Sequence, residues 1–300
     1  MATHLNLHLL RLFAAVVEHR GFSRAADALF VTQSAVSKGV RELERQLDLA
    51  LLDRSSTDGG RRGVRLTDAG EALYRHARAL FAMEKAALED VRDRVGLHRG
   101  RLRIGASTTV AGYWLPPALA RFAAAHPDIA LSLQVDNTAG VAEAVAAGGL
   151  DVGFVEGAVD DARLRALRWR DEPLQLITAD DDPLAGRKRP AASTLSARTW
   201  LLREPGSGTR QVAQAWLQAE GISPRRTLEI GSNEAIARAV AEGAGLAILP
   251  AVVVADPLAA GRLRALHAPG KRALVRPLFQ LELAQRPRPP ALEAFLALLD

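Results

Sequence analysis

The sequence predicts a multidomain protein, in which a helix-rich N-terminal domain built on a helix-turn-helix precedes an α/β domain of two subdomains. Three observations predict this fold class. Residues 21–52 contain two short helical patterns joined by a tight turn. Residues 67–95 carry an apolar stripe at the spacing of a long helix. From residue 102 onward, strand and helix patterns alternate, which is typical of parallel strands joined by crossover helices.

Composition limits the classes of function. A chain of 300 residues with 48% hydrophobic residues is long enough for two or three domains with a sizeable core. Cysteine is absent and the seven histidines are scattered, so we expect no disulfide, no metal and no cofactor. We see no signal-peptide pattern and no apolar run of the ~18 residues that a membrane span needs, which predicts a cytoplasmic protein without a membrane partner. The net charge of +5 favours polyanionic partners.

A first helix precedes the helix-turn-helix. Its apolar residues fall on one face, and Gly21 ends it. We expect this helix to pack across the two that follow. The apolar positions are Leu9, Leu12, Phe13, Val16 and Val17.

The helix-turn-helix itself has recognisable start signals. Ser23 is the expected N-cap of its first helix, and Phe30 with Val31 forms the turn. Thr32 is the expected N-cap of the second helix. The buried face of that second helix is predicted from steps of four, three and four residues, at Val36, Val40, Leu43 and Leu47.

The opposite face of the second helix carries amide, hydroxyl and cationic groups, with no acid before Glu42. A solvated surface is the alternative, but such surfaces usually mix acids and bases. The pattern therefore favours contact with base edges and phosphates. The candidate DNA-binding residues here are Ser23, Arg24, Thr32, Gln33, Ser34, Ser37, Lys38 and Arg41.

A two-stranded wing is predicted next, because residues 51–66 place glycine and aspartate turn signals between two short apolar ends. Arginines around the turn are suited to phosphate or minor-groove contact. A loose surface loop is the alternative. The wing candidates are Arg54, Arg61, Arg62 and Arg65.

Thr67 is the expected cap of a long helix, with Asp68 and Glu71 in the first turn, where they suit the helix dipole. Its apolar stripe predicts a helix-to-helix dimer. Packing against the chain's own next domain is the alternative. The stripe consists of Leu73, Ala77, Leu80, Met83, Ala87, Val91 and Val95.

The remaining chain predicts two α/β subdomains that enclose a cleft. The expected strands are 102–106, 129–135, 150–157, 173–179, 200–204, 228–232, 246–250 and 277–283. The expected helices are 113–125, 138–147, 209–220, 233–242 and 290–299.

Polar residues follow three of these strands, at residues 107–109, in the segment EPGSGTR at 204–210, and at 232–233. Ligands bind at the carboxyl ends of parallel strands, near helix N-termini. We therefore expect hydroxyl and N–H groups to form a neutral anion cradle without a fixed cation. Plain helix capping is the alternative. The candidate effector-binding residues are Ser107, Thr108, Thr109, Thr138, Glu156, Ser207, Gly208, Thr209, Ser232 and Asn233.

Catalytic patterns are weak. The serine in PGSGT lacks the nucleophile-elbow spacing, the same segment lacks the lysine of a phosphate loop, and no carboxylate pair stands near a histidine. Asp151 and Glu156 are more typical of hydrogen-bond acceptors. We expect no enzymatic activity.

The block FSRAADALFVTQSAVSKGVRELERQL and the helix start LTDAGEAL resemble the LysR-type transcriptional regulators. The resemblance covers the whole chain. It implies a winged helix-turn-helix, an effector domain with two Rossmann-like subdomains like a type 2 periplasmic binding protein, a homotetramer built as a dimer of dimers, and RNA polymerase as a partner. By position, Gln33, Ser37 and Lys38 resemble the family's major-groove readers, and Arg54 and Arg65 its wing contacts.

Two departures and one further motif refine this resemblance. Ser34 stands where the family commonly has proline, and the wing SSTDGGRRG looks longer than usual. LREPGSGTR resembles a branch associated with sulfur metabolism and carbon fixation, which points to a small oxyanion.

The resemblance also implies boundaries. We expect a DNA-binding domain at 1–66, a linker and dimerisation helix at 67–95, and an effector-binding domain at 96–300. Subdomain 1 would comprise about 100–172 and 276–300, and subdomain 2 about 173–275. The competing hypothesis is a cytoplasmic anion-binding module with an N-terminal dimerisation arm, which would have no use for outward-pointing Gln33, Ser37 and Lys38.

Overall fold

The computed structural model describes residues 4–53, 64–95, 100–186, 190–267 and 274–299. The chain divides into two compact units, Met1–Leu88 and Glu89–Asp300. They are called the N-terminal unit and the effector unit, and each is described by itself.

The N-terminal unit has the predicted order of elements. Its helices pack around an apolar core that includes Phe13, Val36 and Leu43. Gly39 lies where α3 meets α1, and a Cβ there would stand 2.3 Å from Leu12 Cδ1, so the glycine permits close helix packing. The elements are α1 (Leu7–Glu18), α2 (Phe22–Leu29), α3 (Gln33–Leu47), β1 (Leu52–Asp53), β2 (Arg65–Leu66) and α4 (Asp68–Val95).

The helix caps agree with the prediction at one position and differ at another. Thr32 Oγ1 accepts from Ala35 N at 3.2 Å and so caps α3, as predicted. The prediction for Ser23 is wrong, because α2 begins at Phe22 and Gly21 holds the N-cap position without a side-chain bond. Phe30 ends α2 in the left-handed region, with φ of 55°, and is 96% exposed in the turn.

The wing is present at its base. β1 and β2 pair antiparallel, with Leu52 opposite Leu66 and Asp53 opposite Arg65. Arg54, Arg61 and Arg62 lie outside the described residues.

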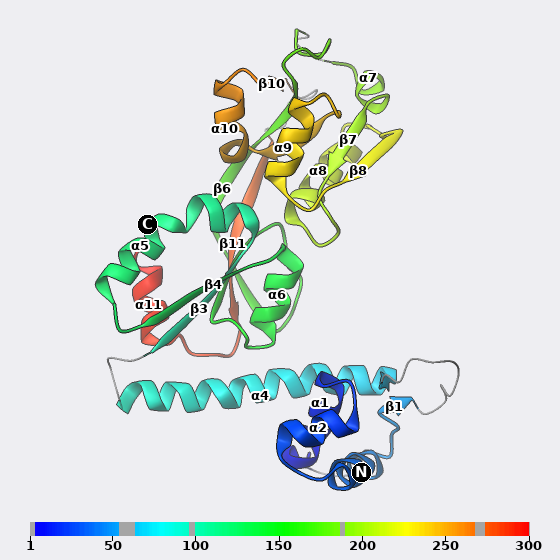
Figure 1. Cartoon of the computed structure of the whole chain (residues 1–300), viewed down its shortest axis with the longest axis vertical. Helices are drawn as coiled ribbons and strands as arrows, with labels where there is room; N and C mark the ends of the chain where they lie inside the picture. The colour runs from blue at the N-terminus through cyan, green and yellow to red at the C-terminus, as the bar shows by residue number, and fades with distance from the viewer. Residues whose placement is uncertain (1–3, 54–63, 96–99, 187–189, 268–273, 300) are drawn as a thin grey trace. The chain divides into compact units, whose positions relative to one another are not determined.

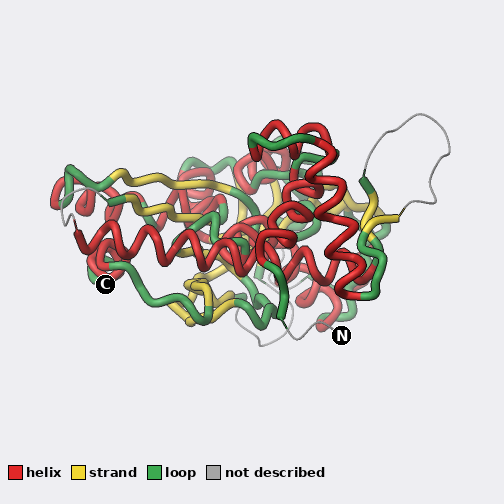
Figure 2. Tube along the Cα trace, turned by 90° about the horizontal axis from the view of Figure 1, so that it is seen from below, coloured by secondary structure: helices red, strands yellow, loops and turns green. Residues whose placement is uncertain are grey.

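Helix α4 runs unbroken over 28 residues, and Figure 2 shows it as one long coil. Thr67 Oγ1 accepts from Gly70 N at 3.0 Å, which is the predicted cap. Ala77 is fully buried and Leu73 packs against the core of the N-terminal unit. These two positions therefore face their own chain, which differs from the predicted dimer seam, whereas Leu80 is 38% exposed. The side chain of Val91 lies outside the described part.

Subdomain 1 of the effector unit has a sheet with helices on both faces. β3 pairs in parallel with β4 and with β5. One face carries a core that includes Phe122, Phe154 and Phe295, and the other carries Val141 and Val145 from α6. The elements are β3 (Arg101–Ala106), the π-helix η1 (Val110–Trp114), α5 (Pro116–Ala125), β4 (Ala130–Val135), α6 (Thr138–Ala146), β5 (Val152–Glu156), β11 (Val275–Leu283) and α11 (Pro290–Leu296).

Subdomain 2 packs helices around smaller groups of strands. β7 and β8 form a parallel pair, and Trp200 forms an isolated bridge to Leu246, just ahead of β9. The elements are α7 (Ala192–Ser196), β7 (Thr199–Leu202), α8 (Gly208–Ala219), β8 (Arg226–Glu229), α9 (Asn233–Ala241), β9 (Ala247–Pro250), α10 (Ala251–Ala259) and β10 (Leu263–Leu266).

Two strands run between the subdomains (Figure 1). β6 (Leu164–Ala179) pairs with β11 along residues 164–173 and with β9 and β10 along 174–179, antiparallel in every case. The expectation of parallel strands throughout is therefore wrong, although it holds for β3, β4, β5, β7 and β8. The sequence analysis also missed the first half of β6, α7, α10 and β10. In α10, Pro257 inside the helix masked the pattern.

Among the described residues, no helix is both long and apolar enough to cross a bilayer.

Candidate functional site

The polar face of α3 is open to solvent. Gln33, Ser34, Lys38 and Arg41 are exposed, and Ser37 is partly exposed. Arg41 Nη2 donates to Ser37 Oγ at 3.2 Å, which holds the guanidinium along this face. Ser23, Arg24, Thr32 and Arg65 are exposed as well. The residues predicted to contact DNA thus lie on the surface of the N-terminal unit wherever the structure describes them.

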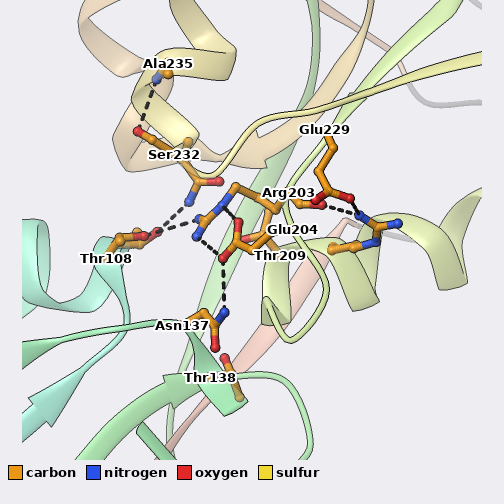
Figure 3. Close-up of polar contacts among 12 residues, drawn as sticks. Thr108, Asn137, Thr138, Arg203, Glu204, Thr209, Glu229, Ser232 and Ala235 are labelled. Atoms are coloured by element: carbon orange, nitrogen blue, oxygen red, sulfur yellow. Dashed lines mark hydrogen bonds and ion pairs between the residues drawn. The ribbon is translucent and has the colours of Figure 1, made fainter. Parts of the chain in front are cut away.

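In the effector unit, the structure brings the three predicted strand-to-helix turns together (Figure 3). Arg203 Nη1 donates to Thr108 Oγ1 at 3.3 Å. Asn233 Nδ2 donates to Thr109 Oγ1 at 2.9 Å, and Ala139 N donates to Gly206 O at 3.1 Å. Hydrogen bonds therefore join the two subdomains at the point where several helices begin.

Gly208 is placed by a close approach. A Cβ at this position would stand 2.0 Å from Glu156 O, so only glycine lets the start of α8 lie against the end of β5. Ser207 precedes it at the N-cap, yet its side chain makes no capping hydrogen bond. Plain capping therefore accounts for Ser232, whose Oγ accepts from Ala235 N at 3.2 Å, but it does not account for Ser207.

The expectation of a cradle without a fixed cation is wrong. The Arg203 side chain is buried and reaches Thr108, as described above. Its charge is matched by Glu204, whose Oε2 accepts from Arg203 Nε at 2.8 Å. Burial opposes ionisation of Glu204, but the hydrogen bonds and charge of Arg203 outweigh it and lower the pKa of Glu204. Arg203 and Glu204 therefore form an ion pair beside the threonines.

A buried ionic cluster, here called the Arg276 cluster, lies next to the turns. It consists of Arg276, Glu172, Glu156, Thr209 and Trp114. Arg276 Nε donates to Glu172 Oε2 at 2.6 Å, and its Nη1 donates to Thr209 Oγ1 at 2.6 Å and lies 3.2 Å from Glu156 Oε1. Trp114 Nε1 donates to Glu172 Oε1 at 2.7 Å. The cluster joins β6 and β11 to the start of α8.

Two site atoms are left over in this arrangement. Ser107 Oγ and Asn233 Oδ1 are buried and have no hydrogen-bond partner among the described residues. Buried polar atoms are rarely left unpaired, and each one is a candidate for contact with water or a ligand. The described part of the chain contains no group of three or more histidine, aspartate or glutamate side chains that could hold a metal ion.

Comparison with known proteins identifies the family. Residues 7–71 match the family described as bacterial regulatory helix-turn-helix protein, lysR family, and residues 96–300 match the LysR substrate binding domain. The chain belongs to the LysR family of transcriptional regulators. The predicted family and fold class are thereby confirmed, and the hypothesis of a binding module with only a dimerisation arm is set aside.

Curated relatives of this LysR-family regulator span most of its length. It is 32% identical to the HTH-type transcriptional regulator CysL of Bacillus subtilis, over 86% of this chain and 85% of that protein. It is also 32% identical to the RuBisCO operon transcriptional regulator of Allochromatium vinosum, over 89% of this chain and 86% of that protein. These names agree with the branch that the LREPGSGTR segment suggests.

Two solved structures are informative. The regulatory domain of CcmR from Synechocystis PCC6803, in complex with 2-PG, is 30% identical, with a TM-score of 0.61, and the match covers 67% of this chain and 96% of that one. Full-length CbnR with its target DNA is 23% identical, with a TM-score of 0.60 and 98% of each chain covered, which supports the shared fold.

Sequence analysis of this LysR-family regulator missed Arg203, Glu204, Glu172 and Arg276 as parts of the site. One signal was present. Glu172 and Arg276 each stand beside an apolar strand pattern, in EPLQLITA and VRPLFQLEL, where an unpaired charge would be costly to bury. Their cross-strand register, Arg276 opposite Glu172, could not be read from the pattern.

Proposed function

We propose that this regulator binds a specific DNA site through α3 and the wing, and that a small anion bound between subdomains 1 and 2 gates this activity. The observation that carries the proposal is the meeting of three strand-to-helix turns at one place, with buried Arg203 beside them. Helix N-termini supply partial positive charge and free N–H groups, so several of them together favour a negatively charged ligand.

The relatives support an anion and narrow its type. CcmR has been captured with 2-PG, which is 2-phosphoglycolate, a phosphorylated carboxylate. Regulators named for the RuBisCO operon and for CysL also align along most of the chain. A carboxylate, a sulfate-like ion or a phosphate-bearing metabolite fits both this pattern and the polar character of the site.

The DNA-binding half of the proposal rests on the exposed face of α3 and on the likeness to a regulator solved with its target DNA. The same proposal includes the finer organisation. The domains are 1–66, 67–95 and 96–300, the assembly is a dimer of dimers, RNA polymerase is a partner, and the protein acts in the cytoplasm without catalysing a reaction.

The test is a calorimetric titration of the full chain with sulfate, 2-phosphoglycolate, glycolate and inorganic phosphate, with and without operator DNA. Thr108→Ala and Ser207→Ala should stay folded, bind DNA, and lose the anion and the response to it, because a ligand shifts an equilibrium only through its different affinities for the two states. Helix capping alone predicts a loss of about 0.5 to 2 kcal/mol of stability and unchanged anion binding. If no anion binds the parent protein, the proposal is wrong.

A further inference from the structure

Three threonine hydroxyls in the proposed site each accept a hydrogen bond from a nitrogen that can only donate. Arg203 Nη1 lies 3.3 Å from Thr108 Oγ1, Asn233 Nδ2 lies 2.9 Å from Thr109 Oγ1, and Arg276 Nη1 lies 2.6 Å from Thr209 Oγ1. Guanidinium and amide NH₂ groups have no acceptor. None of the three hydroxyl protons can therefore be directed at the nitrogen behind it.

The protons of these three hydroxyls are also not used elsewhere. Within the described part of the chain, the bonds just given are the only hydrogen bonds recorded for the three side chains. A hydroxyl carries one proton and rotates to suit its partners. Each threonine thus holds one O–H donor available to a bound molecule.

Two other candidate hydroxyls behave differently. Thr138 Oγ1 donates to Glu156 O at 2.9 Å. Ser232 Oγ accepts from Ala235 N and lies 3.0 Å from Glu234 Oε2, which can only take its proton when the carboxylate is ionised. The protons of Thr138 and Ser232 are therefore already engaged with the protein. The hydroxyls that the sequence placed in one group fall into two.

The nearest carboxylate does not offset these donors. Glu204 Oε1 accepts from Arg203 Nη2 at 2.9 Å and from Asn137 Nδ2 at 3.3 Å, and its Oε2 accepts from Arg203 Nε. Its acceptor capacity is directed at its own chain.

Building on the proposed function, we propose that Thr108, Thr109 and Thr209 supply the ligand's hydrogen-bond donors, and that Asn233 and Arg276 are positioning residues that turn the hydroxyl protons towards it. The preferred ligand is an oxyanion whose oxygens facing the threonines carry no hydrogen, such as sulfate, a carboxylate or a phosphate monoester dianion. An amide NH₂ or protonated oxygen in that place would meet a donor with a donor. Thr138 and Ser232 hold the fold and do not select the ligand.

The first experiment measures the dissociation constants of sulfate and 2-phosphoglycolate for the full chain, with glycolate and glycolamide as a charge-and-polarity pair. Thr109→Val and Thr209→Val keep the side-chain shape and should weaken both anions about 10- to 100-fold, the cost of losing a hydrogen bond to a charged group. Thr109→Ser and Thr209→Ser should restore binding. Glycolamide should not bind.

The matched controls are Thr138→Val and Ser232→Ala, which remove hydroxyls from the same region. They should lower the thermal midpoint and leave the anion affinity unchanged. Equal losses of affinity in the controls and in the valine variants would overturn the proposed division. Absence of anion binding to the parent chain would instead reject the proposed function itself.

A double-mutant cycle tests whether Asn233 acts through Thr109. Asn233→Asp preserves shape but turns the donor behind Thr109 into an acceptor, so the hydroxyl proton should turn inward and anion affinity should fall. If Asn233 acts through Thr109, the pair Asn233→Asp with Thr109→Val should bind no more weakly than Asn233→Asp alone. Additive losses would show that the aspartate acts on the anion by charge alone and would remove Asn233 as a positioning residue. Should Asn233→Asp fail to fold, the threonine variants decide the question.

Discussion

The two units of this regulator place their functional polar groups in opposite settings. In the N-terminal unit, Lys38 and its neighbours lie exposed on α3 over a core of apolar side chains. In the effector unit, Thr109, Thr209 and Arg276 are buried between elements that hold the subdomains together. The difference teaches that substitutions on α3 change binding while sparing the fold, whereas substitutions at the effector site change binding and stability together.

The largest effect is expected from Arg276→Met. Removing the guanidinium leaves Glu172 and Glu156 buried without their cation, which should cost the effector unit about 3 to 5 kcal/mol. All four tryptophans, Trp114, Trp169, Trp200 and Trp216, lie in this unit, so tryptophan fluorescence during urea unfolding reports on it specifically.

Arg168→Met is the control for that prediction. Its ion pair with Asp171 is exposed, with 64% and 50% of the side chains accessible, and such pairs contribute at most about 1 kcal/mol. A small loss for Arg276→Met, similar to that of the control, would contradict the view that buried charge holds the effector unit together.

The second prediction concerns the N-terminal unit. Lys38→Ala and Ser37→Ala should each weaken specific DNA binding by about 1 to 3 kcal/mol if the residue pairs with a base edge, while the fluorescence midpoint of the effector unit stays unchanged. Gel-shift titrations at several salt concentrations provide the measurement. Arg45→Ala, at an exposed position near the other end of α3, should bind DNA nearly as the parent does. Unchanged affinity in both test variants would remove α3 as the reading element.

The third prediction concerns assembly through α4. Leu80 is 38% exposed in the chain, so Leu80→Glu should cost the monomer little, yet bury a charge if this position faces a second copy. Light scattering should then show a smaller species than for the parent. Arg75→Glu, an exposed charge change on the same helix, should leave the assembly intact. An intact oligomer in Leu80→Glu would limit α4 to contacts within its own chain.

The smallest expected effect is a loss of stability in acid. Burial opposes ionisation of Asp151, but hydrogen bonds from Arg103 and the charges of Arg103 and Arg286 outweigh it, so the pKa of Asp151 is lowered. A lowered carboxyl pKa contributes stability above the unfolded value of about 3.9 and loses it as the pH falls through the folded value. Urea midpoints from tryptophan fluorescence should therefore drop below about pH 4, and Asp151→Asn should drop less steeply. Parallel curves for the two proteins would refute this role of Asp151.

The contrast between the units also explains what sequence analysis could reach. The caps by Thr32 and Thr67 involve neighbours three residues away, so a local pattern predicts them. The exposed face of α3 follows from helical periodicity in the same way. The strand-to-helix turns were found because hydroxyls and glycines cluster there.

Other features depend on partners far away in the sequence. Arg203 lies 95 residues from Thr108, and Arg276 lies 104 residues from Glu172. Such pairs are set by strand register and subdomain packing, which a local pattern does not contain. Ala77 illustrates the same point in the N-terminal unit, since its stripe predicts an apolar face but does not say which surface covers it.

The position of β11 has a consequence for biosynthesis. β11 is the last strand of the chain, yet it lies between β6 and β5 in the middle of the sheet, and α11 completes the core behind it. While the polypeptide is being made, β5 and β6 must therefore wait with unpaired edges until almost the whole chain has left the ribosome, a state in which exposed strands readily pair with other chains. The helices of the N-terminal unit are complete long before that, so the nascent regulator acquires its DNA-reading surface first and its sensor last.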